Sequence, residues 1–208
     1  MRGRLWLNYF TEMIVAKRQD KEYPVEPSYW RDAEWTEFMR KVMDSVGEKM
    51  NCRVVRLRPD DKERSGEYLN IDAVFIDEAE YDLVEKEKIE WDPFVLPRAV
   101  VELENSSKSM KISYCLWKIL CVRAPIRVLI CSQSNKDEVI TLKEYLERVI
   151  WRGSLIKGTE GDLLVIIGDE SVSKSWAPGV PWGEYYGKYF SVFEWRNDRL
   201  EKIEGLKW

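Results

Sequence analysis

Two short segments of this chain combine the apolar character of β-strands with acidic side chains. The first covers residues 69–77 and contains Asp72, and the second covers residues 99–105 and contains Glu102 and Glu104. A carboxylate removed from water is costly unless it is paired with a positive charge or binds a metal ion. The apolar neighbours supply no such partner, so we expect the acids to share a hard divalent cation.

Strand geometry indicates how these acids are arranged. Side chains alternate across a strand, so Glu102 and Glu104 face one side while Val101 and Leu103 face the other. If the Asp72 strand lies beside this one, three carboxylates converge on one patch, as they do in oxygen-ligated Mg²⁺ sites. The alternative is an edge strand whose acids face solvent.

The length and the hydropathy pattern favour one domain covering residues 1–208. We divide it into a core at about 30–170 and an aromatic-rich extension at about 171–208, where a Trp-rich loop is expected at 175–187. No apolar run approaches the roughly 18 residues of a membrane span, and no signal-peptide pattern follows Met1. We therefore expect a cytoplasmic protein with no membrane partner.

Composition excludes several kinds of site. The chain has no histidine, which rules out Ser-His-Asp triads, His-ligated zinc and histidine general bases. The four cysteines lack Cys-x-x-Cys spacing and are predicted to be reduced. The net charge is −4, so a nucleic-acid-binding protein of this composition would have to concentrate its positive charge locally.

Periodicity and turn signals predict the order of elements along the chain. The expected order is helix 32–50, strand 52–57, polar turn 58–66, strand 69–77, acidic connection 77–92, strand 99–105, helix 108–122, strand 126–131, helix 136–151 and strand 162–168. A hairpin is expected at the end of the chain, around Asn197 and Asp198.

This order, with an Asp on the second strand and Glu-x-Glu on the third, resembles the core of the PD-(D/E)XK, or restriction endonuclease-like, nuclease superfamily over about residues 30–133. The resemblance implies an α/β fold whose mixed central sheet is flanked by helices, with the C-terminal β-hairpin as an extension. It also implies that Asp72 and Glu102 ligate Mg²⁺, with Mn²⁺ as a substitute. The chain departs from the family motif at Ile71, which replaces Pro, and at Glu104, which replaces Lys.

The missing motif lysine leaves two candidates for its role. Glu104 could accept a proton from metal-bound water, or Lys108 could reach back from the start of the next helix. Glu34 of the first predicted helix is a candidate outer ligand, although an acid near a helix N-terminus is also simply favourable there. Asn105 is expected to hydrogen-bond a ligating Glu.

The helix after the Glu-x-Glu segment carries a row of positive charge. Lys111 and Lys118 share one stripe, with Lys108 and Tyr114 beside it, and apolar residues occupy the opposite face. Because the helix begins next to the acids, the stripe could contact a nucleic-acid backbone. An ordinary solvated amphipathic helix is the alternative.

These observations predict a metal-dependent endonuclease that hydrolyses phosphodiester bonds. DNA is favoured over RNA as the substrate, and the enzyme could act as a homodimer. The alternative is an inactive nuclease-like module that binds nucleic acid or a protein partner. A glycosidase fits less well, because Glu102 and Glu104 share one face of one strand instead of flanking a sugar.

Overall fold

The computed structural model describes residues 2–19, 32–56, 70–87, 95–153, 160–177 and 179–208. Within these ranges the chain forms seven strands and seven helices. The strands are β1 (Cys52–Val55), β2 (Ala73–Asp77), β3 (Ala99–Glu104), β4 (Ile126–Gln133), β5 (Asp162–Asp169), β6 (Phe190–Arg196) and β7 (Arg199–Lys202). The helices are α1 (Arg2–Arg18), α2 (Asp32–Met50), α3 (Glu78–Glu87), α4 (Ser109–Leu120), α5 (Lys136–Gly153), α6 (Glu170–Lys174) and α7 (Trp182–Tyr189).

The seven described strands form one mixed sheet whose spatial order follows the sequence, from β1 at one edge to β7 at the other. The pairs β1–β2 and β2–β3 are antiparallel, and the pairs β3–β4 and β4–β5 are parallel. The final hairpin pairs with β5 through β6, so it continues the central sheet. Helices α4 and α5 connect the parallel strands, as parallel pairing requires.

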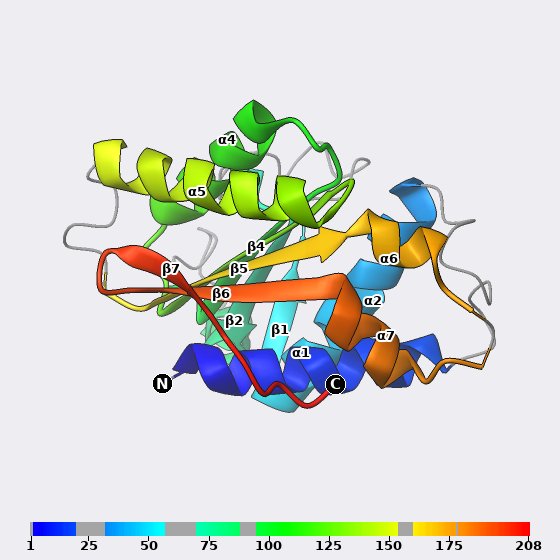
Figure 1. Cartoon of the computed structure of the whole chain (residues 1–208). Coiled ribbons are helices and arrows are strands. Elements are labelled where there is room, and N and C mark those ends of the chain that lie inside the picture. The colour runs from blue at the N-terminus through cyan, green and yellow to red at the C-terminus, as the bar shows by residue number, and fades with distance from the viewer. Residues whose placement is uncertain (1, 20–31, 57–69, 88–94, 154–159, 178) are drawn as a thin grey trace.

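Helices cover both faces of the sheet (Figure 1). Helices α4 and α5 lie over one face, and α1, α2 and α7 lie over the other. Both faces of the central strands are therefore buried, which explains why β4 and β5 read as nearly continuous apolar runs instead of alternating ones.

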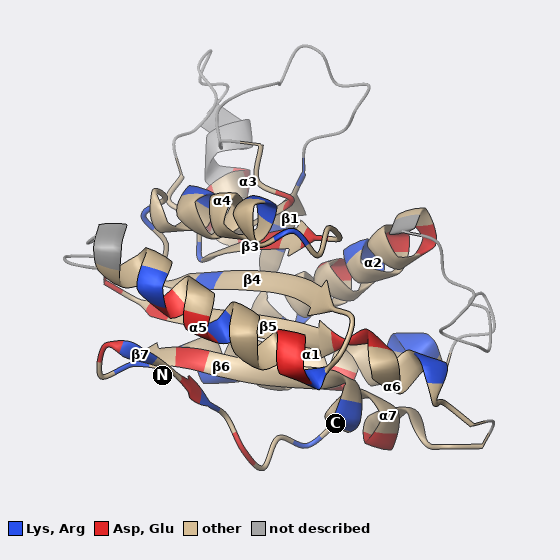
Figure 2. Ribbon diagram, turned by 45° about the horizontal axis from the view of Figure 1, so that its top comes forward, with Lys and Arg blue, Asp and Glu red and all other residues tan. Residues whose placement is uncertain are grey.

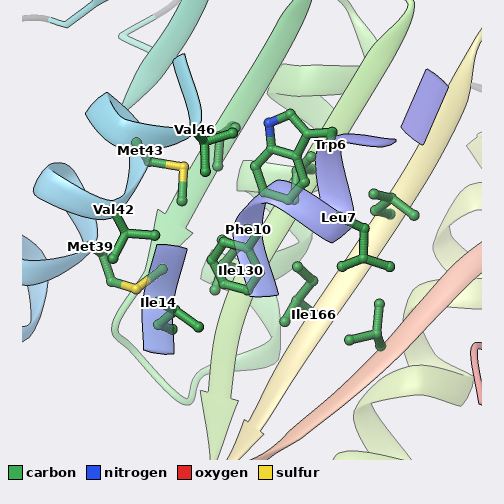
Figure 3. Close-up of a cluster of buried hydrophobic side chains, with 14 of the residues drawn as sticks. Trp6, Leu7, Phe10, Ile14, Met39, Val42, Met43, Val46, Ile130 and Ile166 are labelled. Carbon is green, nitrogen blue, oxygen red and sulfur yellow. The ribbon is translucent and has the colours of Figure 1, made fainter. Parts of the chain in front are cut away.

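The α1 and α2 face holds a densely packed aromatic and aliphatic core (Figure 3). Trp6, Phe10 and Ile14 of α1 recur at helical spacing and are fully buried, and Trp6 stacks on Phe10 with ring centroids 5.3 Å apart. Residues of α2, including Met39 and Met43, complete this layer. Packing against α1 and this core thus fixes α2 over the sheet edge formed by β1 and β2.

The α4 face is held by a narrower apolar stripe. Ile112, Leu116 and Ile119 of α4 are fully buried against β3 and β4. The rise and spacing of these residues place them on one side of the helix, as predicted from the sequence. This packing fixes the position of α4 above the acidic segment of β3.

The predicted α/β class and the order of core elements are confirmed. The terminal hairpin is also present, and Asn197 and Asp198 have positive φ values of 50° and 60°, as a type I′ turn requires. The polar turn expected at 58–66 lies outside the residues that the structure describes. In the described ranges no helix has the length and apolar character needed to cross a membrane.

Four of the described helices were not expected from the sequence, and one of them is the short helix α6 that follows β5. The N-terminal helix α1 precedes the predicted core, and α3 forms the first part of what was expected to be an acidic connection. The segment 175–187 was expected to be a loop, but α7 begins there after Pro181. Gly183 and Gly187 of α7 pack against Trp208, where an added Cβ at Gly183 would lie 2.5 Å from the Trp208 carbonyl oxygen. These glycines serve close packing and do not mark a loop.

Candidate functional site

The two acidic segments lie side by side, which is the condition for their acids to converge. Asp72 was expected on the second strand, but β2 begins at Ala73 and Asp72 lies just before it. Strands β2 and β3 are antiparallel, and Ala73 pairs with Val101, so the preceding Asp72 lies next to the Glu102 end of β3. The backbone N–H of Leu103 donates a hydrogen bond of 2.8 Å to Asp72 Oδ2. This bond fixes the Asp72 side chain against the third strand.

Glu102 is the most deeply buried acid of the site. Only 1% of its surface is exposed, because α4 packs over β3 at this point. Lys118 of α4 lies above it, with its Nζ atom 2.8 Å from Glu102 Oε1. The same Nζ donates a hydrogen bond of 3.2 Å to the carbonyl oxygen of Asn70. Lys118 therefore connects α4, β3 and the segment that leads into β2.

The surroundings of Glu102 favour its neutral form. Burial, and then the negative charge of Asp72, raises the pKa of Glu102 to about 7, although Lys118 acts in the opposite direction. Burial also opposes the charge on Lys118, but its contact with Glu102 outweighs burial and raises the Lys118 pKa. The site therefore combines a charged ammonium with a carboxyl group that titrates near neutral pH.

Asp72 experiences opposing influences. Its desolvation in the fold raises its pKa, and the Leu103 hydrogen bond and the charges of Lys118 and Arg40 lower it. Glu104 adds a repulsive contribution that raises it further. The net shift is upward, so Asp72 and Glu102 are two neighbouring carboxyl groups that both favour additional positive charge.

Glu104 faces the same side of β3 as Glu102, but its carboxylate is hydrogen-bonded to the loop that follows β3. Its Oε1 accepts a hydrogen bond of 2.7 Å from the N–H of Ser106, and Cys115 Sγ lies 3.6 Å from its Oε2. Burial raises the pKa of the Cys115 thiol, with the charge of Glu102 as the next cause. The thiol is thus a neutral group packed beside the acids.

The expectation of three convergent carboxylates is not met in the part of the chain that the structure describes, where no group of three or more Cys, Asp or Glu side chains is arranged to hold a metal ion. The partner expected for Glu102 was a divalent cation, whereas the structure places Lys118 there. Asp72 and Glu102 still form a pair of oxygen donors. Two carboxylates suit Mg²⁺, which keeps several waters and takes one or two such ligands.

Lys118 was predicted to lie on an exposed stripe, and this prediction is wrong. Only 8% of its surface is exposed, because the C-terminal half of α4 covers β3 and the long stem of the side chain is buried. Lys108, Lys111 and Tyr114 are exposed as predicted. Lys108 is the N-cap residue of α4, and its side chain makes no capping hydrogen bond.

Asn105 was predicted to hydrogen-bond a ligating Glu, but its Nδ2 donates to Thr36 Oγ1 at 2.7 Å. This bond connects the end of β3 to α2. Glu34, the candidate outer ligand, is half-buried on α2. Glu104 and Asn105 also line a cavity of about 10 Å³, which is room for about one water molecule. The cavity is therefore too small for a substrate.

Sequence reasoning missed Arg40 and the contact of Lys118 with Glu102. Arg40 of α2 is close enough to Asp72 for its charge to lower the Asp72 pKa. No local pattern connects residues 40, 72 and 118, because three separate elements bring them together. The only available signal was the expectation that a buried acid needs a positive partner.

Comparison of the chain with protein-family models, curated proteins and solved structures finds no match in any of the three.

Proposed function

We propose that this protein is a metal-dependent nuclease in which Asp72 and Glu102 bind Mg²⁺ or Mn²⁺ and DNA is the favoured substrate. One observation carries the proposal. Asp72 and Glu102 lie on neighbouring antiparallel segments, close enough for the charge of Asp72 to raise the pKa of Glu102. Two acids held together in this way gain from a shared cation, and Mg²⁺ prefers oxygen ligands.

The arrangement of elements supports the resemblance to the PD-(D/E)XK nucleases. That resemblance implies a helix, three strands, a second helix and a fourth strand. The chain has α2, three antiparallel strands β1 to β3, and a parallel strand β4 reached through α4, with α3 inserted between β2 and β3. The first Glu falls on the third strand, as in the motif, and the Asp falls one residue before the second strand instead of on it.

Lys118 could supply the positive charge that the lysine of the motif would otherwise provide. Glu104 occupies the motif position, but Lys118 brings an ammonium group to 2.8 Å from Glu102 Oε1 from the following helix. We therefore assign Lys118 as a positioning residue that orients Glu102 and balances its charge. Glu104 then need not replace a lysine, and Lys108, which is exposed at the N-cap of α4, is left to contact substrate.

The protein groups would act as follows. Asp72 and Glu102 would hold the cation in their ionised forms, and Glu102 would have to release its proton to do so. When bound, Mg²⁺ lowers the pKa of a coordinated water and offsets the charge of a phosphate. Arg40 and Lys118 add positive charge around the acids, which would stabilise the negative charge that develops on the scissile phosphate.

The alternative is a module that keeps the fold and binds nucleic acid or protein without cleavage. The ion pair itself favours this alternative, because Lys118 already neutralises Glu102 without a metal. In this case the buried pair serves the fold alone. The two functions differ in what removal of the acids does to nucleic-acid cleavage.

A cleavage assay separates the two functions. Labelled single-stranded and duplex DNA and RNA are incubated with Mg²⁺, Mn²⁺ or EDTA. We expect cleavage only with a divalent ion. Asp72→Asn and Glu102→Gln should each reduce cleavage by about 10²-fold to 10³-fold, as expected when one group that supports transition-state charge stabilisation is removed. Glu194→Gln is the matched control, because Glu194 is also a buried strand acid but pairs with two arginines instead.

Two results would contradict the proposal. One is wild-type protein that cleaves none of the substrates with either ion, which leaves the binding module. The other is Glu102→Gln protein that cleaves at the wild-type rate, which assigns the activity to another site.

A further inference from the structure

Helix α4 exposes a row of large apolar side chains on the face opposite its buried stripe. Met110 is 79% exposed, Tyr114 is 58% exposed and Trp117 is 40% exposed. These residues lie at positions i, i+4 and i+7 and so share one face of the helix. The core does not use this face, since Ile112, Leu116 and Ile119 on the other side are fully buried.

The two rings on this face form an ordered pair. The centroids of Tyr114 and Trp117 are 5.7 Å apart and their planes differ by 22°, which is an offset-stacked arrangement. Each ring is already held by its neighbour while its outer surface remains accessible. A flat ligand that stacks on this pair would therefore order little additional side-chain freedom.

The charge around this face indicates an anionic partner. Residues 105–136 contain six Lys or Arg and no Asp or Glu, although the whole chain has a net charge of −4. Lys118 and Arg127 are buried and the other four are exposed. In Figure 2 the lysines of α4 are blue and the helix carries no red. Lys108 and Lys111 are exposed beside the aromatic rings. Lysines that flank exposed aromatic rings suit a chain of phosphates with accessible bases.

The aromatic face is adjacent to the acids. Lys118 Nζ lies 5.7 Å from the centroid of the Tyr114 ring and 2.8 Å from Glu102 Oε1. A single side chain therefore separates the exposed rings from the buried carboxylate. A strand held on the rings would therefore lie on the outer side of Lys118, whose inner side contacts Glu102.

We propose that the exposed face of α4 binds unpaired bases of a single-stranded nucleic acid, with Tyr114 and Trp117 stacking on the bases and Lys108 and Lys111 contacting phosphates. Unpaired bases fit this surface because the bases of a duplex are already stacked on one another and offer no free ring face. The inference rests on the proposed function only for the substrate class, since stacking needs no cleavage. It narrows the substrate to single strands, or to duplexes with an unpaired segment.

Binding in EDTA tests this face separately from catalysis. Fluorescence anisotropy compares a labelled 20-nucleotide oligothymidylate with a 20-base-pair duplex at the same salt concentration. We expect wild-type protein to bind the single strand at least about tenfold more tightly. Tyr114→Ala and Trp117→Ala should each weaken single-strand binding by about 5-fold to 100-fold, the range found for loss of one base–aromatic stack. Tyr114→Phe should retain binding.

Two controls separate stacking from other effects. Trp151→Ala removes another exposed tryptophan, 60% exposed at the end of α5, and should leave binding unchanged. Lys111→Ala should weaken the binding of single strands and make that binding less dependent on salt. The further loss of affinity caused by Tyr114→Ala should be the same with or without Lys111→Ala. Circular dichroism of each variant verifies that it is folded.

The outcomes distinguish this inference from the proposed nuclease. Duplex binding as tight as single-strand binding, or full single-strand binding by the Tyr114→Ala, Trp117→Ala double variant, would overturn the inference whether or not the protein cleaves. Single-strand binding that needs the two rings, in a protein that never cleaves, would support the inference while the nuclease proposal fails. A wild-type dimer that binds no oligonucleotide and dissociates in the double variant would identify a second copy as the occupant and overturn it.

Discussion

Two glutamates in the same sheet are almost completely buried, yet they have different surroundings. Glu194 of β6 is 3% exposed and is paired with Arg196 at 2.8 Å and with Arg4 of α1 at 3.4 Å. Glu102 of β3 is 1% exposed and has Lys118 on one side and Asp72 nearby. Two guanidinium groups compensate the first acid, whereas the second lies between a cation and another acid. Burial of an acid therefore does not identify a functional site; its set of partners does.

The largest expected effect on stability comes from removing Lys118, the positively charged partner of Glu102. At pH 8, Lys118→Met should lower the free energy of unfolding by about 3–5 kcal/mol, because it leaves a buried carboxylate without a counter-charge. Urea unfolding at pH 8 and pH 5 measures the effect. The loss should shrink at pH 5, where Glu102 is protonated, and equal losses at both pH values would contradict this assignment.

Replacing both members of the pair should restore much of that loss. Buried ion pairs are often exchanged for apolar residues at little net cost. We expect Glu102→Leu combined with Lys118→Met to be more stable than Lys118→Met alone by about 2–4 kcal/mol at pH 8. A double-mutant cycle in urea provides the comparison. Strictly additive losses would show that the two side chains do not interact.

The raised pKa of Glu102 predicts a pH dependence of stability. In EDTA, the folded protein retains the Glu102 proton up to about pH 7, whereas an unfolded chain releases it near the ordinary value of 4.5. Between these values the folded state binds more protons, so this contribution to stability falls as pH rises from 4.5 to 7. The decrease is at most about 3 kcal/mol for a shift of this size.

Glu102→Gln supplies the control for this prediction, because it cannot titrate. The difference in unfolding free energy between wild type and Glu102→Gln should change across pH 4.5–7. The same comparison of unfolding free energies for Glu194→Gln tests whether an acid paired with two arginines shows the same change with pH. A difference for Glu102→Gln that stays constant with pH would contradict the raised pKa.

The smallest effect is expected at the doubly paired acid. Arg4→Ala removes the longer of the two contacts to Glu194 and leaves Arg196 in place. Because the Arg4 side chain is partly exposed, we expect a loss of about 1 kcal/mol or less in urea unfolding. If Arg4→Ala lowered the free energy of unfolding as much as Lys118→Met does, Glu194 and Glu102 would not differ in how strongly they depend on one partner.

The sequence predicted the acids well because their geometry is local. Alternation along a strand determines that Glu102 and Glu104 share a face, and turn chemistry at Asn197 and Asp198 defines the final hairpin. The Asp72 segment also lies beside β3, which was the condition set for the acids to meet. Each of these features depends on neighbours that are close in the sequence or on simple strand order.

The partner of Glu102 could not be predicted in the same way. Lys111 and Lys118 are seven residues apart and lie nearly on one stripe, yet one is exposed and the other is buried. The difference arises because Lys118 reaches Glu102 and the Asn70 carbonyl oxygen, and these contacts are set by tertiary packing. Arg40 reaches the site for the same reason. Helix α7 was missed because its glycines, which allow close packing of Trp208, read locally as loop signals.

Calorimetric titration with Mn²⁺ tests the central claim, that Asp72 and Glu102 form a cation site, most directly. We predict one binding event per chain in the wild type at pH 8, its loss in Asp72→Asn, and wild-type binding in Glu194→Gln. Absence of Mn²⁺ binding in the wild type, or unchanged binding in Asp72→Asn, would show that the pair of acids beside Lys118 serves the fold alone.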